Sequence, residues 1–445
     1  MERGRAARTT LHRRDQGLLV LPADRDPMGV LEQQHAQRLP ELISLRLERM
    51  LANPFAFYRG TAALQAADLS NSPVSGPEVV LCGDAHIGNF GVYASPQRQL
   101  VFDLNDFDEA AFGPWEWDVK RLITSVVIGA RHNGFDEDTV RQAALETVSN
   151  YRLGLRQILK LGASERYFMH SSVLREEGLR PSSQKALDRV VEASERRTSE
   201  RVFAKITRQE PDGSVVIIED PPTLTHVRQE ISDALDDIFA AYCATVSPDI
   251  AVLLKHYTPT DAVRRVVGVG SVGTRCYLMM LTGPLGEPLI LQFKEATESV
   301  LTEFGQLPRH TPPGLDAVLM DSHNGFRVVA SQRVLQAVSD PFLGYVSVGG
   351  FTFYVRQFRD RNASFVLDDL PPNPFTDYSR ACGAVLARGH AQSPDAAIIS
   401  GYLGNSATFD ETIVEWALAY ADVSYGDYQL LQESVAAGRF EQVVA

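Results

Sequence analysis

The sequence predicts an α+β protein with two lobes, one dominated by helices and one by strands. Apolar residues recur at helical spacing over residues 119–127 and 138–161, which indicates helices that each bury one face. Over residues 265–295 and 344–358, short apolar runs alternate with glycine-containing turns, a pattern typical of β-hairpins. Residues 378–445 return to helical spacing, so helices are expected on both sides of the strand-rich region.

Composition and charge bound the classes of function. The chain has 445 residues, 44% hydrophobic and 22% charged, the balance of a globular protein with a sizeable core. A formal net charge of −13 disfavours nucleic acid and anionic membranes as partners, and we expect neither. Four cysteines without a CxxC pair argue against a zinc knuckle or a disulfide framework and fit a reducing cytoplasm. No apolar run approaches the roughly 20 residues that span a bilayer, and we expect a cytoplasmic protein.

The most informative stretch, residues 81–118, reads LCGDAHIGNFGVYASPQRQLVFDLNDFDEAAFGPWEWD. Asp84 and Asn89 lie in a loop after one predicted strand, and Asp106 follows the next predicted strand. Pairing of these two strands would bring both loops to one edge, where the three side chains converge. Oxygen ligands of this kind suit magnesium that bridges phosphates. Phosphoryl transfer also needs a carboxylate that orients the nucleophile.

A motif D-x-x-x-x-N followed by a strand and D-F resembles the catalytic and metal loops of protein kinases. The local pattern is more similar still to aminoglycoside phosphotransferases and choline kinases. This resemblance implies that Asp84 orients or deprotonates the acceptor, that Asn89 and Asp106 hold Mg²⁺, and that Asp118 holds the catalytic loop by hydrogen bonds. Cys82 departs from the family, which usually has a scaffold histidine there. The matching positions are Gly83, Asp84, His86, Asn89, Asp106, Phe107, Glu109, Ala110, Gly113, Pro114 and Asp118.

Several charged residues keep two interpretations. Asp103 and Asp108 either help to bind metal or are solvated, although acids this dense favour a bound cation. His86 and His390 are expected to be hydrogen-bonded scaffold residues rather than bases. Three arginines either face the site, where they could hold phosphate or an acidic substrate, or bridge domains through carboxylates. These are Arg59, Arg356 and Arg359.

A glycine-rich segment lies in the second half of the chain. Residues 268–275 read GVGSVGTR, a G-x-G-x-x-G pattern that is weak alone. A dinucleotide-binding fold would continue into a helix, whereas residues 276–281 are apolar and strand-like. A glycine loop that closes a hairpin is the kinase arrangement, in which backbone amides cover the phosphates of ATP. The predicted nucleotide-binding positions are Gly268, Gly270, Ser271 and Gly273.

Lys294 ends the next predicted strand, where the resemblance implies the lysine that contacts the α- and β-phosphates. Its acidic partner stays open between Glu298 and Glu303 on a short following helix. In protein kinases the glycine loop and the lysine precede the catalytic loop, whereas here they follow it. We therefore expect a protein-kinase-like two-lobed fold in circularly permuted order, which surface termini make feasible.

Taken whole, the sequence resembles the domain-of-unknown-function family 2252 (DUF2252). The segments that carry this resemblance are RMLANPFAFYRG, CGDAHIGNFG, FDLNDFDEAAFGPWEWDVKRL, VVGVGSVGTR, LQFKEA, FYVRQFRD and LARGHA. The expected organisation has five parts. They are a disordered basic tail (1–27), a catalytic-lobe segment (28–170), a charged connector (171–259), a β-rich nucleotide-binding lobe (260–360) and C-terminal helices that complete the catalytic lobe (361–445).

The expected function is an ATP- and Mg²⁺-dependent phosphotransferase that acts on an unidentified small-molecule or protein substrate. Three alternatives stay open. One is a nucleotide-binding regulator of the pseudokinase type, and another is an AMP transferase that holds the nucleotide inverted. The third is a metal-dependent hydrolase built on Asp84, His86, Asp103 and Asp106.

Overall fold

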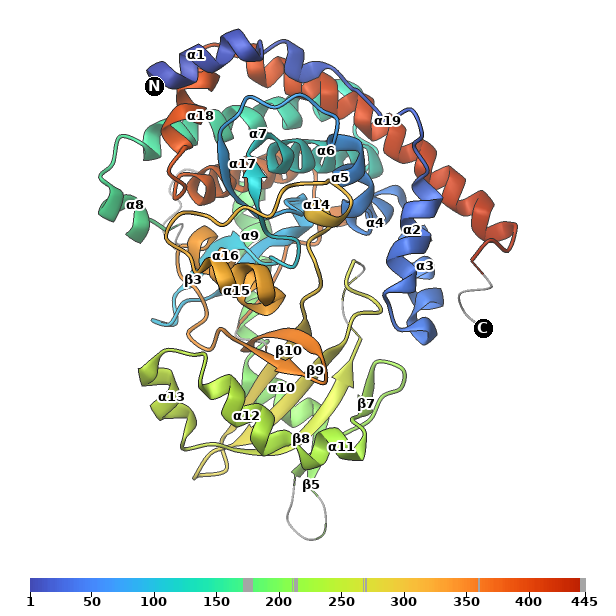
Figure 1. The fold of residues 1–445 in the computed structure, drawn as a ribbon, viewed down its shortest axis with the longest axis vertical. Coiled ribbons are helices and arrows are strands. Elements are labelled where there is room, and N and C mark those ends of the chain that lie inside the picture. Colours follow the sequence, from blue (N-terminus) through green and yellow to red (C-terminus); the bar gives the residue numbers. More distant parts are fainter. Residues whose placement is uncertain are drawn as a thin grey trace.

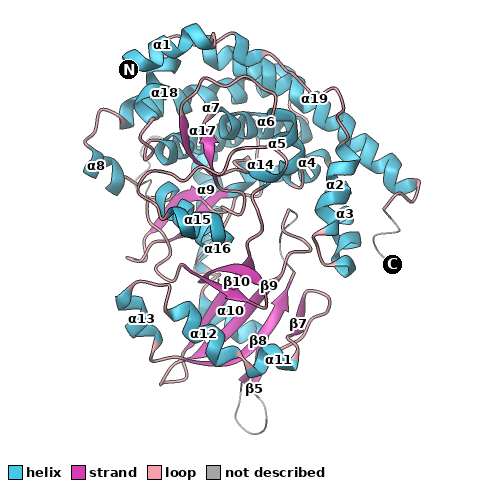
Figure 2. Ribbon diagram, viewed as in Figure 1, coloured by secondary structure: helices cyan, strands magenta, loops and turns pink. Residues whose placement is uncertain are grey.

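The structure is a computed structural model that describes residues 1–170, 179–209, 211, 215–266, 268, 270–358 and 361–440. Helices form most of one part of the molecule, and a six-stranded sheet forms the centre of the other (Figure 1). Figure 2 shows that the sheet strands gather below the helical part, with further helices around them. The α+β class is therefore confirmed. No helix in the described ranges is long and apolar enough to cross a membrane.

The helical part is built around long helices that bury apolar faces against one another. Gly383 lets the helix Pro372–His390 approach the helix Glu137–Ile158 closely, because a Cβ at this position would lie 2.4 Å from the carbonyl oxygen of Thr147. The helices predicted over residues 119–127 and 138–161 are both present. The helices of this part are α6 (Glu116–His132), α7 (Glu137–Ile158), α8 (Ala163–Phe168), α9 (Pro181–Glu195), α17 (Pro372–His390), α18 (Ala396–Leu403) and α19 (Thr408–Ala436).

The N-terminal residues are ordered, so the expected disordered tail over residues 1–27 is wrong. Helix α1 (Glu2–Thr10) packs against α18. Arg8 donates to the carbonyl oxygens of Gly401 and Tyr402 at 2.7 and 2.8 Å. These carbonyls lack intrahelical partners because they lie in the last turn of α18. A sequence rich in arginine carries no apolar periodicity, so this docking left no signal in the local pattern.

Short helices follow α1 and surround one edge of the site described below. They are α2 (Pro27–Ala36), α3 (Ile43–Leu51), α4 (Pro54–Arg59) and α5 (Ala62–Leu69). Asp26 and Asn53 cap α2 and α4 by accepting hydrogen bonds from backbone amides. Proline at the first helical position of both helices adds a preset backbone angle. The expected helical character of residues 28–70 is therefore confirmed.

The large sheet is antiparallel throughout, in the order β11-β12-β10-β9-β8-β7. The hairpins predicted over residues 265–295 and 344–358 are confirmed. One face of the sheet packs Leu281 and Phe293 against Phe239 and Tyr242. The strands are β7 (Leu224–His226), β8 (Thr258–Arg265), β9 (Cys276–Thr282), β10 (Pro288–Glu295), β11 (Gly344–Val348) and β12 (Phe351–Gln357).

The segment expected to be a charged connector, residues 171–259, instead contributes to both parts. Its helices cover both faces of the sheet, and β7 forms one sheet edge. Helix α9 belongs to the helical part of the molecule, where its Val190 packs against Val92 and Leu100. The elements of this segment after α9 are α10 (Ser199–Ile206), β5 (Thr207–Gln209), β6 (Val215–Ile217), α11 (Gln229–Asp233), α12 (Leu235–Cys243) and α13 (Pro248–Leu254).

Two small ribbons position the acidic loops. The expected pairing of residues 79–81 with residues 100–104 is wrong. Instead β1 (Glu78–Leu81) pairs with β4 (Ala111–Pro114), and β2 (Phe90–Ala94) pairs with β3 (Leu100–Leu104). The loop from β1 to β2 and the loop from β3 to β4 therefore both run from one ribbon to the other. This topology brings the two loops side by side, and the amide of Asn105 donates to the carbonyl of Asn89 at 2.9 Å.

Three helices connect β10 to the last hairpin (Figure 1). They are α14 (Val300–Glu303), α15 (Ala317–Ser322) and α16 (Asn324–Leu335). Arg327 of α16 donates to the carbonyl oxygens of Asp108 and Thr297 at 2.9 and 2.8 Å. It also donates to the carbonyl oxygen of Ala110. One buried arginine thus ties the loop after β3 to the segment after β10.

Candidate functional site

One pocket is lined by residues from both motifs that the sequence singled out. The acidic loops contribute three of the predicted residues and the glycine loop contributes another three. The pocket opens to solvent, and most of the residues that line it are polar or charged. The predicted residues that line it are Asp84, Asn89, Asp106, Gly268, Gly270 and Ser271.

Helix α6 holds the loop after β1 along one helical face. The carboxylate of Asp118 accepts hydrogen bonds from the amides of Cys82 (2.7 Å) and Gly83 (2.9 Å). One turn later Arg121 reaches Asp84, and one turn after that the hydroxyl of Ser125 accepts from the amide of Ile87 at 2.9 Å. These residues share a face because residues three, four and seven apart lie above one another on a helix. The role predicted for Asp118 is confirmed.

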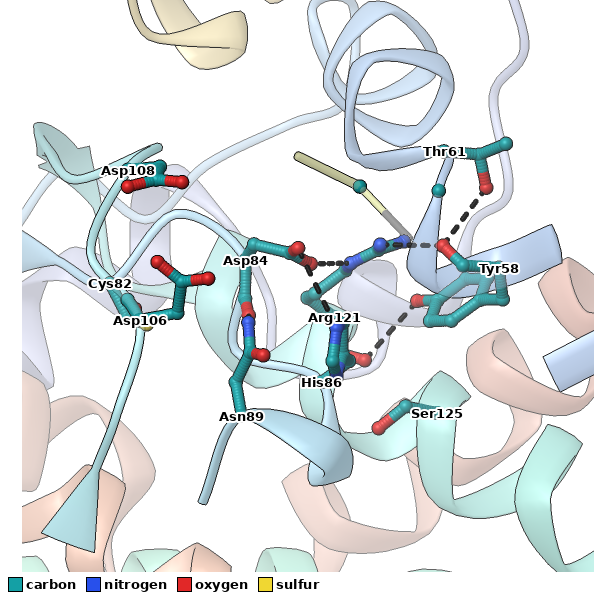
Figure 3. Close-up of polar contacts among 12 residues, drawn as sticks. Tyr58, Thr61, Cys82, Asp84, His86, Asn89, Asp106, Asp108, Arg121 and Ser125 are labelled. Carbon is teal, nitrogen blue, oxygen red and sulfur yellow. Dashed lines mark hydrogen bonds and ion pairs between the residues drawn. The ribbon is translucent and has the colours of Figure 1, made fainter. Parts of the chain in front are cut away.

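Arg121 is a site residue that the sequence analysis missed. Its Nε donates to Oδ1 of Asp84 at 2.7 Å, and another nitrogen donates to the carbonyl of Tyr58 at 2.7 Å (Figure 3). Burial alone would raise the pKa of Asp84, but the charge of Arg121, with His86, holds it below the usual value. Asp84 is therefore ionised and fixed in orientation. The available signal was a charged residue three positions after Asp118, which places it on the same face of the predicted helix.

Gly83 permits the close approach of the two acidic loops. Its φ is +83°, in the left-handed region that favours glycine. A Cβ at this position would lie 1.9 Å from the carbonyl oxygen of Glu109, so no other residue fits without moving the loops apart. The thiol of Cys82 donates to the carbonyl of Asp106 at 3.3 Å. Cys82 thus also joins the two loops.

Asn89 and Asp106 offer oxygen ligands toward the pocket. The side-chain amide nitrogen of Asn89 donates to the carbonyl of Asp84 at 2.8 Å, which leaves the amide oxygen for a ligand. Figure 3 shows Asp84, Asn89, Asp106 and Asp108 together on the two loops. Burial and the neighbouring Asp108 raise the pKa of Asp106, despite the charge of Lys294. A divalent cation would relieve this unfavourable crowding of negative charge.

The donor set fits Mg²⁺ shared with phosphates rather than a cage built only from protein. Within the described residues, no group of three or more His, Cys, Asp and Glu side chains is placed to hold a metal ion. Mg²⁺ is usually bound through one or two carboxylates, together with water and substrate phosphates. Asn89 and Asp106 match that smaller requirement.

The glycine loop is anchored by arginines of α3 and of the segment before it. Arg46 donates to the carbonyl of Gly270 at 3.1 Å, and Arg49 donates to the carbonyl of Gly268. Arg38 donates to the carbonyl of Val272 at 2.6 Å. The loop carbonyls are therefore satisfied from the helical part, and the loop is held over the pocket.

Gly273 and Ser271 make different contacts. Gly273 has φ +93° and does not line the pocket, but its carbonyl accepts from the amide of Leu39 at 2.8 Å. The hydroxyl of Ser271 donates to Oδ2 of Asp108 at 3.3 Å. The glycine loop thus touches the acidic loop directly, and Gly273 serves as an anchor.

Lys294 reaches the acidic loop from the end of β10. Its Nζ lies 3.4 Å from both carboxylate oxygens of Asp106 and also contacts Asp108. The expected glutamate partners are both wrong. Glu298 pairs with Arg309 at 2.6 Å, and Glu303 accepts a hydrogen bond from Gln37. The lysine is neutralised by the two aspartates of the loop after β3.

The remaining candidates separate into near and distant groups. Asp108 lines the pocket, whereas Asp103 accepts hydrogen bonds from the amides of Ala337 and Leu104, both at 2.9 Å, and does not line it. His390 is buried between Asp118 (3.2 Å) and Tyr151 (2.8 Å), as expected for a scaffold residue.

Among the arginines, Arg59 lines the pocket together with His86. Arg356 donates to the side chain of Gln292 at 3.0 Å and to the carbonyl of Asn105 at 3.3 Å, outside the pocket lining. Arg359 lies outside the described residues.

A model of the protein family described as "Uncharacterized protein conserved in bacteria" (DUF2252) matches residues 38–434. The chain therefore belongs to this family. Neither the curated proteins nor the solved structures contain a match to the chain.

Proposed function

We propose that this member of the DUF2252 family is an ATP- and Mg²⁺-dependent phosphotransferase with a circularly permuted, kinase-like two-lobed fold. The observation that carries the proposal is the pocket itself. Acidic-loop residues Asp84, Asn89 and Asp106 line it together with Gly268 and Gly270 of a glycine loop that comes much later in the chain. Two motifs that resemble phosphate-binding patterns, the acidic loops and the glycine loop, thus line one pocket.

Each residue has a role that its contacts support. Asn89 and Asp106 would hold Mg²⁺, which neutralises the phosphates when bound. Lys294, which pairs with Asp106 beside the pocket, would exchange this pairing for an α- or β-phosphate oxygen. Asp84 orients the acceptor hydroxyl and takes its proton as the acceptor oxygen bonds to the γ-phosphorus. The bond from that phosphorus to the β,γ-bridging oxygen breaks, and ADP leaves.

The order of the motifs along the chain supports the proposed permutation of the lobes. The glycine loop and Lys294 belong to the sheet, and the acidic loops precede that sheet in the chain. Helix α1 and the last turn of α19 lie at the periphery of the helical part (Figure 1), where a change of connection costs little.

The hydrolase alternative is less well supported. It requires Asp103 beside Asp84, His86 and Asp106. The carboxylate of Asp103 is occupied by backbone amides and lies outside the pocket lining. Regulation without turnover and AMP transfer use the same pocket residues and are distinguished below by their products.

Calorimetric titration with ATP, in the presence and absence of Mg²⁺, tests the proposal. We expect Mg²⁺-dependent binding to the wild type that weakens about tenfold to a hundredfold in Lys294→Ala and in Asp106→Asn, since each loses contacts to charged groups. Lys185→Ala, on the exposed face of α9, serves as the matched control.

Product analysis then separates the chemistries. Slow release of ADP that stops in Asp84→Asn supports phosphoryl transfer. Release of pyrophosphate indicates AMP transfer, and binding without any product indicates a regulator. Absence of ATP binding, together with metal binding that Asp106→Asn abolishes, would return the hydrolase to first place.

A further inference from the structure

Arg59 is a cation of the pocket that has no hydrogen-bond or ion-pair partner among the described residues, although the charges of Asp84 and Asp106 attract it. It is the last residue of α4 and lines the pocket, yet its guanidinium makes no hydrogen bond or ion pair with any residue that the structure describes. Its Nε is buried and unsatisfied. Arg38 and Arg121, by contrast, each donate to oxygen atoms of the protein. The side chain is only partly buried, but its buried Nε donor lacks an acceptor, which an anionic ligand would supply.

His86 supplies a second unsatisfied atom in the same place. Its side chain is only 3% exposed and lines the pocket. Nε2 lies 3.7 Å from a carboxylate oxygen of Asp84, while Nδ1 is buried without a hydrogen-bond partner among the described residues. Buried polar atoms are nearly always satisfied, so an orphan pair points to a missing ligand or water.

The two orphan atoms border one small space. A Cβ built on Gly88 would lie 3.4 Å from Nε of Arg59 and 3.2 Å from Nδ1 of His86. Gly88 belongs to the loop that carries Asp84 and Asn89, and any side chain there would crowd both nitrogens. A guanidinium and an imidazole, each with an unsatisfied nitrogen, thus lie together on the pocket wall, a pair that suits a small anionic oxygen group.

We propose that Arg59, with His86, forms a subsite for a phosphate or carboxylate group of the acceptor substrate. The assignment to the acceptor rests on the proposed function, because Asp84 is the residue that orients the acceptor there. The acceptor is then an anionic molecule whose hydroxyl reaches Asp84 while its charged group binds Arg59. The nucleotide's terminal phosphate is the other source of the same chemistry, and the test distinguishes the two.

The test uses inorganic phosphate as the probe, without nucleotide or Mg²⁺. Thermal unfolding is followed against potassium phosphate, with potassium chloride of equal ionic strength as reference, because a ligand bound only to the folded state raises Tm. We expect phosphate to bind Arg59→Gln about tenfold to a hundredfold more weakly than the wild type. Arg14→Gln, the same change at an exposed arginine, controls for charge and for the general stabilising effect of phosphate.

A steric variant guards against a folding failure of Arg59→Gln. Gly88→Ala keeps both side chains but places a methyl group against both nitrogens, and we expect it to lose the phosphate-specific rise in Tm. Gly426→Ala is its control, since an added Cβ there meets nothing within 4 Å. Equal phosphate responses in the wild type, Arg59→Gln and Gly88→Ala would overturn the subsite, as would a wild type that phosphate does not stabilise beyond the chloride reference.

A parallel titration with MgATP identifies the source of the anion. Unchanged MgATP affinity in Arg59→Gln supports an acceptor group. A parallel loss of phosphate and MgATP binding assigns the subsite to the nucleotide and overturns the acceptor assignment. Phosphate binding that depends on Arg59 in a protein that does not bind MgATP would reject the proposed function while the anion subsite stands.

Discussion

Nε of Arg121 lies 2.7 Å from Oδ1 of Asp84, and the arginine side chain is only 3% exposed. This ion pair joins α6 to the loop that carries the proposed catalytic carboxylate. Breaking a buried pair by removing one partner leaves an uncompensated charge. The geometry of the site therefore depends on a residue 37 positions along the chain from Asp84.

Arg121→Gln is expected to lower the free energy of unfolding by about 3–5 kcal/mol at pH 7. The double variant Arg121→Gln/Asp84→Asn should recover part of that loss, because the unpaired charge is gone. Urea denaturation of all four members of the cycle measures the coupling. The exposed pair Arg131–Glu137 is the matched control and should couple by only about 0.2–1 kcal/mol. Equal coupling in the two cycles would contradict the structural role of Arg121.

Gly83→Ala should disrupt the contact between the acidic loops. The substitution combines a positive φ with a Cβ at 1.9 Å from the carbonyl of Glu109. Gly76→Ala isolates the first effect, since Gly76 has φ +104° and open space around it. We expect Gly76→Ala to cost about 1–2 kcal/mol and Gly83→Ala clearly more, with loss of MgATP binding. Similar unfolding midpoints for the two variants would show that the loops tolerate separation.

Asp118→Asn tests how the catalytic loop is held. An asparagine can accept only with its oxygen, so one of the amides of Cys82 and Gly83 would face an NH₂ group. We expect a loss of about 1–3 kcal/mol in the free energy of unfolding and a larger fall in turnover than in MgATP affinity. Asp24→Asn, at an exposed position, is the control. A variant with full stability and turnover would mean that the loop holds its shape without Asp118.

Glu109 gives the stability a pH dependence with a defined sign. Burial raises its pKa to about 7 from an ordinary 4.5, although the amide of Val300 donates to it. The folded state therefore favours the protonated acid. This contribution is present below pH 4.5 and is lost as the pH rises through about 7.

Glu109→Gln should flatten that dependence. Between pH 5 and pH 8 the wild type is expected to lose about 2 kcal/mol more than the variant, as measured by urea denaturation at each pH. Glu48→Gln, at an exposed position of α3, should follow the wild type. Parallel curves for wild type and Glu109→Gln would rule out Glu109 as the source.

Sequence patterns anticipated much of the fold wherever the signal is local. The hairpins that contain Lys294 and Gly349, and the helices that carry Val126 and Tyr151, follow from periods of two and 3.6 residues. The pairing of β1 with β4 could not be predicted from the sequence, because pairing of strands that follow one another in the chain was the simpler expectation. The docking of α1 through Arg8 also left no local trace, since it depends on carbonyls at the far end of the chain.

The candidate site likewise combines residues that the sequence indicated with contacts that it did not. Asp84, Asn89, Asp106 and the glycine loop stand out from residue type and spacing, and the fold brings them to one pocket. Asp108 as a partner of Lys294 did not stand out, because the acidic loop and β10 approach each other only in three dimensions.

By itself, the sequence determined the local elements, the α+β class, the family and the residues that could carry phosphate chemistry. These properties reside in neighbouring residues, in their periodicity and in short motifs. Only the tertiary structure decided which of those residues meet. The approach of Lys294 to Asp106 across 188 positions, and the orphan pair of Arg59 and His86, depend on packing between distant segments. No local pattern encodes such contacts, because their free energy arises when several elements are buried together.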